Sequence, residues 1–145
     1  MKRIAILLAD DDEELRKLFR EILELEDDFE VVGEAKDGQE AVALAMTLRP
    51  ALVLMDITMP LLNGLQATTQ ILKSIPTTKI LMHSAHSEEA YIIEAINSGA
   101  MGYLIKQTSA GSVCDAIREV HQGKTFFSPS IPVHLHNWKR KSPAD

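Results

Sequence analysis

Four polar groups in the chain each follow a short apolar run, at the point where a buried strand would end. An acidic stretch, Asp10 to Glu14, follows the first run, and Asp56 follows the third. Ser84 and Lys106 follow the fourth and fifth runs. In doubly wound α/β sheets, ligands bind beyond the carboxyl ends of the strands, so we expect these side chains to share one edge.

The acidic groups point to a hard cation and to phosphoryl chemistry. If the first and third strands are neighbours, Asp10, Asp11 and Asp56 converge and repel one another. Mg²⁺ suits a site with few carboxylate ligands and several waters. A hydroxyl at Ser84 and an ammonium at Lys106 would complete a cradle for a phosphoryl group.

Each of these residues also has an ordinary structural explanation. An acidic run after a strand is often the first turn of a helix, where carboxylates suit the helix dipole. Asp56 alone is compatible with a turn, Ser84 with the neighbourhood of a helix cap, and Lys106 with a solvated surface charge. Their common place at one end of one sheet favours a functional site.

The elements that would position these residues alternate along the chain. Strands are expected at five apolar runs: Ile4–Ala9, Phe29–Ala35, Ala51–Met55, Lys79–Met82 and Met101–Ile105. Helical periodicity follows each run, with Ser87 expected to cap the fourth helix, which ends at Gly99. The prediction is an α/β fold with a doubly wound, five-stranded parallel sheet in the flavodoxin-like order 2-1-3-4-5, and the second strand lies at an edge.

Length, composition and charge set the limits of the function. The chain has 145 residues, a formal charge of −6 and one cysteine, Cys114, which fits a reducing compartment. The negative charge argues against a general nucleic-acid surface. No apolar run is long enough to span a bilayer, so a cytoplasmic location with no membrane partner is the default expectation. We expect one domain over 1–123 and a linker or C-terminal tail over 124–145, with no clear periodicity from His134 onward.

Four motifs together resemble the receiver (CheY-like) domain of two-component response regulators. The residues that carry the resemblance are Asp10-Asp11 with Arg16, Met55 to Pro60 with Asn63-Gly64, Met82 to Ala85, and Gly99 to Lys106. The match covers Lys2 to about Gln122, and the order and spacing of the motifs are specific although each motif is weak alone.

The resemblance implies roles for individual residues and a cofactor, Mg²⁺. Asp56 resembles the phosphoacceptor and Lys106 the lysine that pairs with the phosphate. Asp11 resembles the direct Mg²⁺ ligand, helped by Asp10 through water and by the backbone carbonyl of Thr58. Asp12 would then begin the turn into the first helix.

Two further residues resemble the switch of the family. Ser84 would move to bond the phosphoryl oxygen, and Tyr103 would follow inward. The face formed by the fourth helix, fifth strand and fifth helix would then change its partners. His86, two residues after Ser84, lies where the family tunes access of water, although an ordinary loop histidine explains it equally well.

The chain departs from the family after Lys106, where Gln107 replaces a common proline. We expect a trans bond here, because a non-proline cis bond costs about 3 kcal/mol. Receivers of the NarL/FixJ type often lack this proline too, and the segment Gly123–Pro129 resembles their linker. The chain is therefore expected to be the front part of a transcriptional regulator whose DNA-binding domain lies outside it.

The expected function is phosphorelay signalling. A sensor histidine kinase would phosphorylate Asp56, the only chemistry would be self-phosphorylation and autodephosphorylation, and phosphorylation would promote a homodimer. A haloacid-dehalogenase-like phosphatase is disfavoured because Thr58 stands where its general acid is needed. A pseudo-receiver that only binds partners is the other alternative. We do not expect His134 and His136 to bind a metal ion. Nor do we expect Lys139 to Lys141 to contact nucleic acid.

Overall fold

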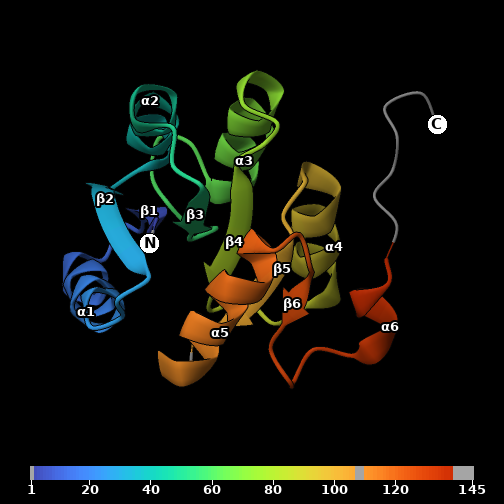
Figure 1. Ribbon diagram of the computed structural model, residues 1–145. Coiled ribbons are helices and arrows are strands. Elements are labelled where there is room, and N and C mark those ends of the chain that lie inside the picture. The colour runs from blue at the N-terminus through green and yellow to red at the C-terminus, as the bar shows by residue number, and fades with distance from the viewer. Residues whose placement is uncertain (1, 107–109, 139–145) are drawn as a thin grey trace.

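The protein is described by a computed structural model over residues 2–106 and 110–138 (Figure 1). The elements in chain order are β1 (Ile4–Ala9), α1 (Glu13–Glu24), β2 (Phe29–Ala35), α2 (Gly38–Leu48), β3 (Leu52–Met55), α3 (Gly64–Ser74), β4 (Lys79–Ser84), α4 (Glu89–Ser98), β5 (Gly102–Ile105), α5 (Ala110–His121), β6 (Phe126–Phe127) and α6 (Val133–His136). Among these residues, no helix has the length and apolar character that crossing a membrane requires.

The strands form one parallel sheet in the order β2-β1-β3-β4-β5-β6. The predicted order of the first five strands is therefore confirmed, with β2 at an edge. The expected number of strands was too low by one, because Phe126 and Phe127 pair with Gly102 and Tyr103 of β5. A strand of two residues has no periodicity that the sequence could reveal.

Helices cover both faces of the sheet, which explains why its central strands are apolar throughout. One core packs α2, α3 and α4 against residues such as Leu7 and Val53. The other packs α1 and α5 against residues such as Leu8 and Leu54. Successive side chains of a strand point to opposite faces, so β1 and β3 each contribute to both cores.

The helix boundaries follow local capping chemistry. The side chain of Asn63 accepts from the backbone N–H of Gln66 at 2.9 Å, and the side chain of Gln66 accepts from the backbone N–H of Asn63 at 3.1 Å. This reciprocal pair fixes the start of α3. Gly99 ends α4 with a φ of 113°, as expected. The expected cap at Ser87 was wrong: Glu88 is the N-cap, and it makes no side-chain capping bond.

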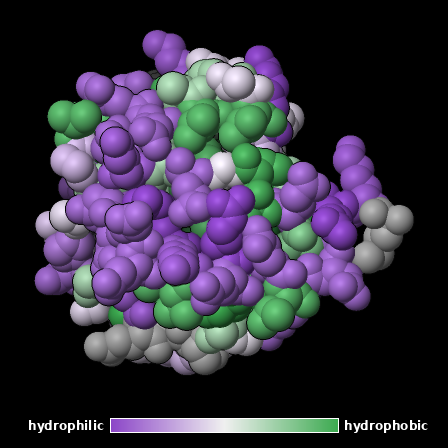
Figure 2. Space-filling view, turned by 90° about the vertical axis from the view of Figure 1, so that its left-hand side faces the viewer, coloured by the Kyte–Doolittle hydropathy of each residue, from purple (hydrophilic) through white to green (hydrophobic). Residues whose placement is uncertain are grey.

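Charged residues protect the β2 edge of the sheet. Figure 2 looks onto the side that carries α1, α2 and β2 and shows mainly hydrophilic residues. Glu30 of β2 is exposed, and Glu34 of the same strand pairs with Arg16 and Arg20 of α1. Charged side chains at an edge strand disfavour pairing with a further strand.

The segment after Gly123 packs onto the sheet as far as the structure describes it. Ile131 and Leu135 are 4% and 1% exposed and belong to the core that contains Tyr103. The segment from His134 onward, expected to belong to a linker or tail without periodicity, is helical as far as His136, because Val133–His136 form α6. The backbone N–H of Ile105 donates to Ser128 Oγ at 2.9 Å, so this segment is tied directly to β5.

Candidate functional site

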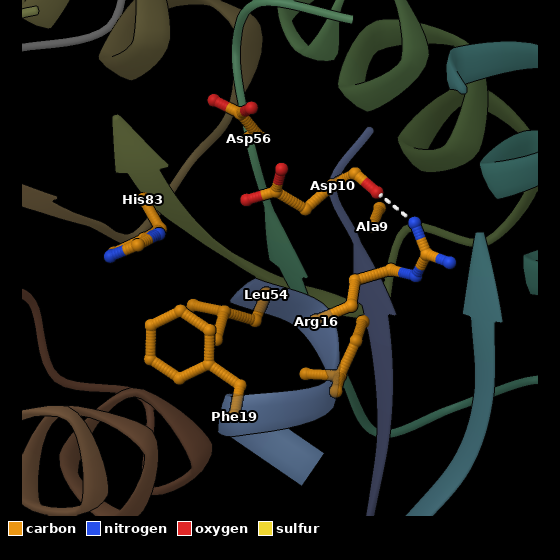
Figure 3. Close-up of a pocket in the computed structure, with 8 residues that line it drawn as sticks. Ala9, Asp10, Arg16, Phe19, Leu54, Asp56 and His83 are labelled. Carbon is orange, nitrogen blue, oxygen red and sulfur yellow. Dashed lines mark hydrogen bonds between the residues drawn. The ribbon is translucent and has the colours of Figure 1, made fainter. Parts of the chain in front are cut away.

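The parallel pairing of β1 and β3 places two aspartates at the same edge of the sheet. Ala9 is opposite Met55, and Asp10 and Asp56 are the next residues of their chains. The backbone N–H of Asp56 donates to the Ala9 carbonyl at 2.9 Å. The two carboxylates therefore leave neighbouring strands side by side, as Figure 3 shows.

Three carboxylates form a group that is suited to a metal ion. One carboxylate oxygen from each of Asp10, Asp11 and Asp56 lies within 4.8 Å of the other two. Asp10 and Asp56 are only 5% and 3% exposed, whereas Asp11 faces solvent. Among residues 2–106 and 110–138, this is the one such group of His, Cys, Asp or Glu side chains.

Lys106 supplies the positive charge closest to this group. Its Nζ lies 3.2 Å from Asp56 Oδ2 and 3.6 Å from Asp10 Oδ2. Burial lowers the pKa of Lys106, but attraction to Asp56 and Asp10 outweighs it and leaves the pKa raised. One ammonium against three carboxylates leaves an excess of negative charge, which a divalent cation with oxygen ligands would balance.

The protonation of the two buried aspartates reflects this crowding. Burial, followed by repulsion from Asp10, raises the pKa of Asp56 from 3.8 to about 6, although Lys106 opposes the rise. Burial also raises the pKa of Asp10. Removing water penalises the charged form of a carboxylate, and a second carboxylate adds to that penalty.

The loop that carries Asp10 and Asp11 is held by several bonds. The backbone N–H of Asp12 donates to Asp10 Oδ1 at 2.9 Å, and Asp12 caps α1 through the N–H of Leu15. The expectation that Asp12 begins the turn into the first helix is therefore confirmed. Arg16 Nη1 donates to the carbonyl of Asp10 at 2.7 Å, the dashed bond in Figure 3.

The two residues expected to form the switch meet at His86. Ser84 Oγ accepts from the backbone N–H of His86 at 3.0 Å, and the hydroxyl of Tyr103 donates to the His86 carbonyl at 2.7 Å. Both side chains are fully buried, and burial raises the pKa of Tyr103 to about 12. Tyr103 is already buried in this structure, whereas the resemblance implied that it moves inward together with Ser84.

The side chain of His86 bridges to the β3–α3 loop. Its Nε2 lies 2.9 Å from Thr58 Oγ1, and its ring stacks on Tyr91 with centroids 4.1 Å apart. The backbone N–H of Thr58 points to Asp56 Oδ1 at 3.4 Å. His86 therefore lies close to Asp56, through Thr58. The alternative explanation, an ordinary loop histidine, did not predict this contact.

His83 is a neighbour of the site that the sequence analysis did not single out. It is 2% exposed, lies edge-to-face with Phe19 at 4.6 Å, and burial lowers its pKa to about 4. With Asp10, Asp56 and Phe19 it lines a cavity of about 10 Å³, room for at most one water molecule (Figure 3). An imidazole interrupting the apolar run before Ser84 was the available signal.

The remaining expectations concern residues away from the acidic group. His134 Nε2 lies 2.7 Å from Glu89 Oε1, while His136 Nε2 lies 3.0 Å from the carbonyl of Ile131. The two histidines thus have different partners. The Lys106–Gln107 bond and the basic residues Lys139 to Lys141 lie outside the described residues.

Comparisons with known proteins agree with this geometry. A family model for the response regulator receiver domain matches residues 6–118. The chain is 38% identical over 138 residues to the response regulator protein VraR of Staphylococcus aureus, covering 95% of this chain and 66% of VraR. It thus spans slightly less than two thirds of the curated relatives it matches.

Two solved structures share the fold closely. The signal receiver domain of the response regulator NarL from Mycobacterium tuberculosis superposes with a TM-score of 0.81 at 29% identity, over 86% of this chain and 100% of that one. A LuxR-family two-component response regulator from Aurantimonas sp. SI85-9A1 superposes with a TM-score of 0.86 at 32% identity, over 90% and 93% of the two chains.

Proposed function

This chain belongs to the response regulator receiver domains, and from that premise we propose that it accepts a phosphoryl group from a sensor histidine kinase on Asp56. The observation that carries the proposal is the place of Asp56. Its carboxylate is buried, with the acidic side chain of Asp10 beside it and Lys106 Nζ 3.2 Å away. We also propose that this phosphoryl transfer takes place in the cytoplasm.

The transfer moves one phosphoryl group between two side chains. A lone pair of the Asp56 carboxylate attacks phosphorus, and the electron pair of the breaking P–N bond returns to the kinase imidazole. With a pKa of about 6, Asp56 is mainly ionised at neutral pH and therefore nucleophilic. The product is an acyl phosphate whose negative charge lies on the phosphoryl oxygens, and Lys106 is placed to pair with one of them.

The residues present fit the Mg²⁺ that receiver chemistry requires. Asp10, Asp11, Asp56 and the backbone carbonyl of Thr58 would hold the ion, because the carboxylate oxygens converge without enough positive charge to balance them. When bound, it would offset negative charge on the phosphoryl oxygens.

The test is intact-mass analysis after incubation with acetyl phosphate and Mg²⁺. We expect a single added phosphoryl mass in the wild type and none in Asp56→Asn. Equal labelling of the variant would remove Asp56 from its role. A wild type that is never labelled would favour a module that only binds partners, and rapid multiple-turnover hydrolysis of a small phosphate ester would favour a phosphatase. Thr58, whose hydroxyl bonds to His86, offers no carboxylic acid for such an enzyme.

Phosphorylation would reach the surface through Ser84 and Tyr103. If Ser84 Oγ turns to the phosphoryl oxygen, it must release the backbone N–H of His86. The same residue accepts the Tyr103 hydroxyl, so the β4–α4 loop and the position of Tyr103 change together. Because Tyr103 is already buried, we propose that phosphorylation holds this inward position rather than creating it.

We further propose that the changed α4–β5–α5 face promotes a homodimer, and that DNA is bound only through a domain outside this chain. VraR, NarL and the LuxR-family neighbour support this class of transcriptional regulator. A coupling of about 1–3 kcal/mol would shift a weak dimer several-fold or more. Sedimentation velocity with and without beryllofluoride and Mg²⁺ measures the change in dimerisation, and amide spectra report on α4 to α5. An unchanged mass together with unchanged spectra would eliminate the switch.

A further inference from the structure

Arg16 of α1 joins the acidic loop to the neighbouring strand β2. Its Nη1 donates to the backbone carbonyl of Asp10 at 2.7 Å, and its Nε donates to Glu34 Oε1 at 3.2 Å. The Arg16 side chain is 14% exposed and that of Glu34 is 26% exposed. A planar guanidinium can donate in two fixed directions at once, so the carboxylate on β2 orients the group that holds the loop.

Arg20 lies one turn further along α1 and provides a natural comparison. It also pairs with Glu34, but its Nε donates to Glu24 at 3.0 Å rather than to the acidic loop. Both arginines therefore anchor α1 to β2 through one carboxylate. Arg16 is the one of the two that reaches Asp10, and Figure 3 shows its guanidinium beside the Asp10 backbone carbonyl, on the side away from the Asp10 carboxylate.

The loop needs such a restraint because its carboxylates repel. Asp10, Asp11 and Asp56 have oxygens within 4.8 Å of one another, so the unrestrained loop would relax by moving away from β3. Asp12 caps α1 with its side chain, and its backbone N–H holds Asp10 through the carboxylate oxygen Oδ1. Arg16 instead holds the backbone carbonyl of Asp10, so its bond occupies no carboxylate oxygen of Asp10 or Asp11.

We infer that Arg16, oriented by Glu34, is a positioning residue that holds Asp10 and Asp11 at the distance from Asp56 at which one cation can bind all three. This inference rests on the proposed function. It assigns to Arg16 a role in metal affinity that is separate from its share in attaching α1 to β2.

The sign of the effect distinguishes positioning from simple electrostatics. Arg16 is a cation close to a site for a cation, so removing its charge would by itself strengthen Mg²⁺ binding. If Arg16 positions the ligands, removing it weakens binding instead. Loss of a group that orients metal ligands typically costs on the order of 10–100-fold in affinity.

The experiment is a calorimetric Mg²⁺ titration of the wild type, Arg16→Gln and the matched control Arg20→Gln. We expect Arg16→Gln to bind on the order of 10–100-fold more weakly and Arg20→Gln to bind no more weakly than the wild type. Glu34→Gln should weaken binding in the same direction by a smaller factor. Equal affinities of Arg16→Gln and Arg20→Gln would overturn the inference.

A second variant keeps the test decisive if Arg16→Gln does not fold. Arg16→Lys keeps the charge, but one compact ammonium cannot reproduce the two fixed donor directions, so weaker Mg²⁺ binding is again expected. Wild-type affinity in Arg16→Lys would overturn the inference. A wild type that binds no Mg²⁺ would overturn the proposed function with it, whereas a wild type that binds while the variants match it would overturn the positioning role alone.

Discussion

Replacing the buried carboxylate of Asp56 by an amide should stabilise the metal-free protein at neutral pH. The pKa of Asp56 rises from 3.8 to about 6 on folding, chiefly through burial and then through repulsion from Asp10. That rise of about two units corresponds to about 3 kcal/mol. The folded state keeps this proton to higher pH than the unfolded state does. The protonated carboxyl therefore contributes this amount to the free energy of unfolding below pH 3.8, and the contribution is lost as pH rises through about 6.

The assay is urea unfolding followed by far-UV circular dichroism at several pH values between 4 and 7.5, without divalent cations. We expect Asp56→Asn to exceed the wild type in free energy of unfolding by up to about 3 kcal/mol at pH 7.5, with little difference at pH 4. This figure already includes the loss of the Lys106 partner at 3.2 Å, because attraction to Lys106 opposes the rise in the pKa of Asp56. The variant should also lose the decline in stability between pH 4 and 6.

The matched control is Glu94→Gln, which neutralises an exposed carboxylate on α4 and should leave the pH dependence unchanged. Saturating Mg²⁺ should then narrow or reverse the difference in free energy of unfolding between the wild type and Asp56→Asn, because the ion stabilises the folded state that binds it. Parallel pH profiles for the wild type and Asp56→Asn, or a less stable variant at pH 7.5, would refute the electrostatic reasoning.

Three further outcomes follow from other contacts. Asp11→Asn should weaken Mg²⁺ binding in calorimetry while leaving or raising metal-free stability, since it removes an exposed member of the repelling group; unchanged affinity would contradict it. Leu135→Ala should cost about 2–5 kcal/mol in urea unfolding, because that side chain is 1% exposed; a cost near zero would mean that α6 does not pack. Gly64→Ala should lower both stability and acetyl phosphate labelling, because a Cβ there would lie 2.1 Å from the Asp56 carbonyl oxygen; wild-type behaviour would rule out that close approach.

Much of the site could be predicted from the sequence because its geometry is a consequence of topology. Parallel strands carry the residues that follow them to one edge of the sheet. Once the apolar runs predicted the order 2-1-3-4-5, Asp10, Asp56 and Lys106 had to lie near one another. One carboxylate oxygen of each aspartate lies within 3.6 Å of Lys106 Nζ. Strong local signals such as Gly99 also fixed where helices end.

Features that depend on contacts between distant segments had no local signature. Phe126–Phe127 and Val133–His136 are too short for any period, and they are ordered by pairing with β5 and by burial of Ile131 and Leu135. His86 could not be separated from an ordinary loop histidine until the fold placed Thr58 beside it.

The same holds for the restraint on the acidic loop. The sequence determined that Asp10, Asp11 and Asp56 are carboxylates at strand ends, and the spacing determined which strands these are. Only the tertiary structure decided that Glu34, eighteen residues beyond Arg16, orients the guanidinium that holds Asp10. Residue type and period encode which groups gather at an edge, whereas hydrogen bonds across elements depend on side-chain positions that exist only after the sheet and α1 have packed.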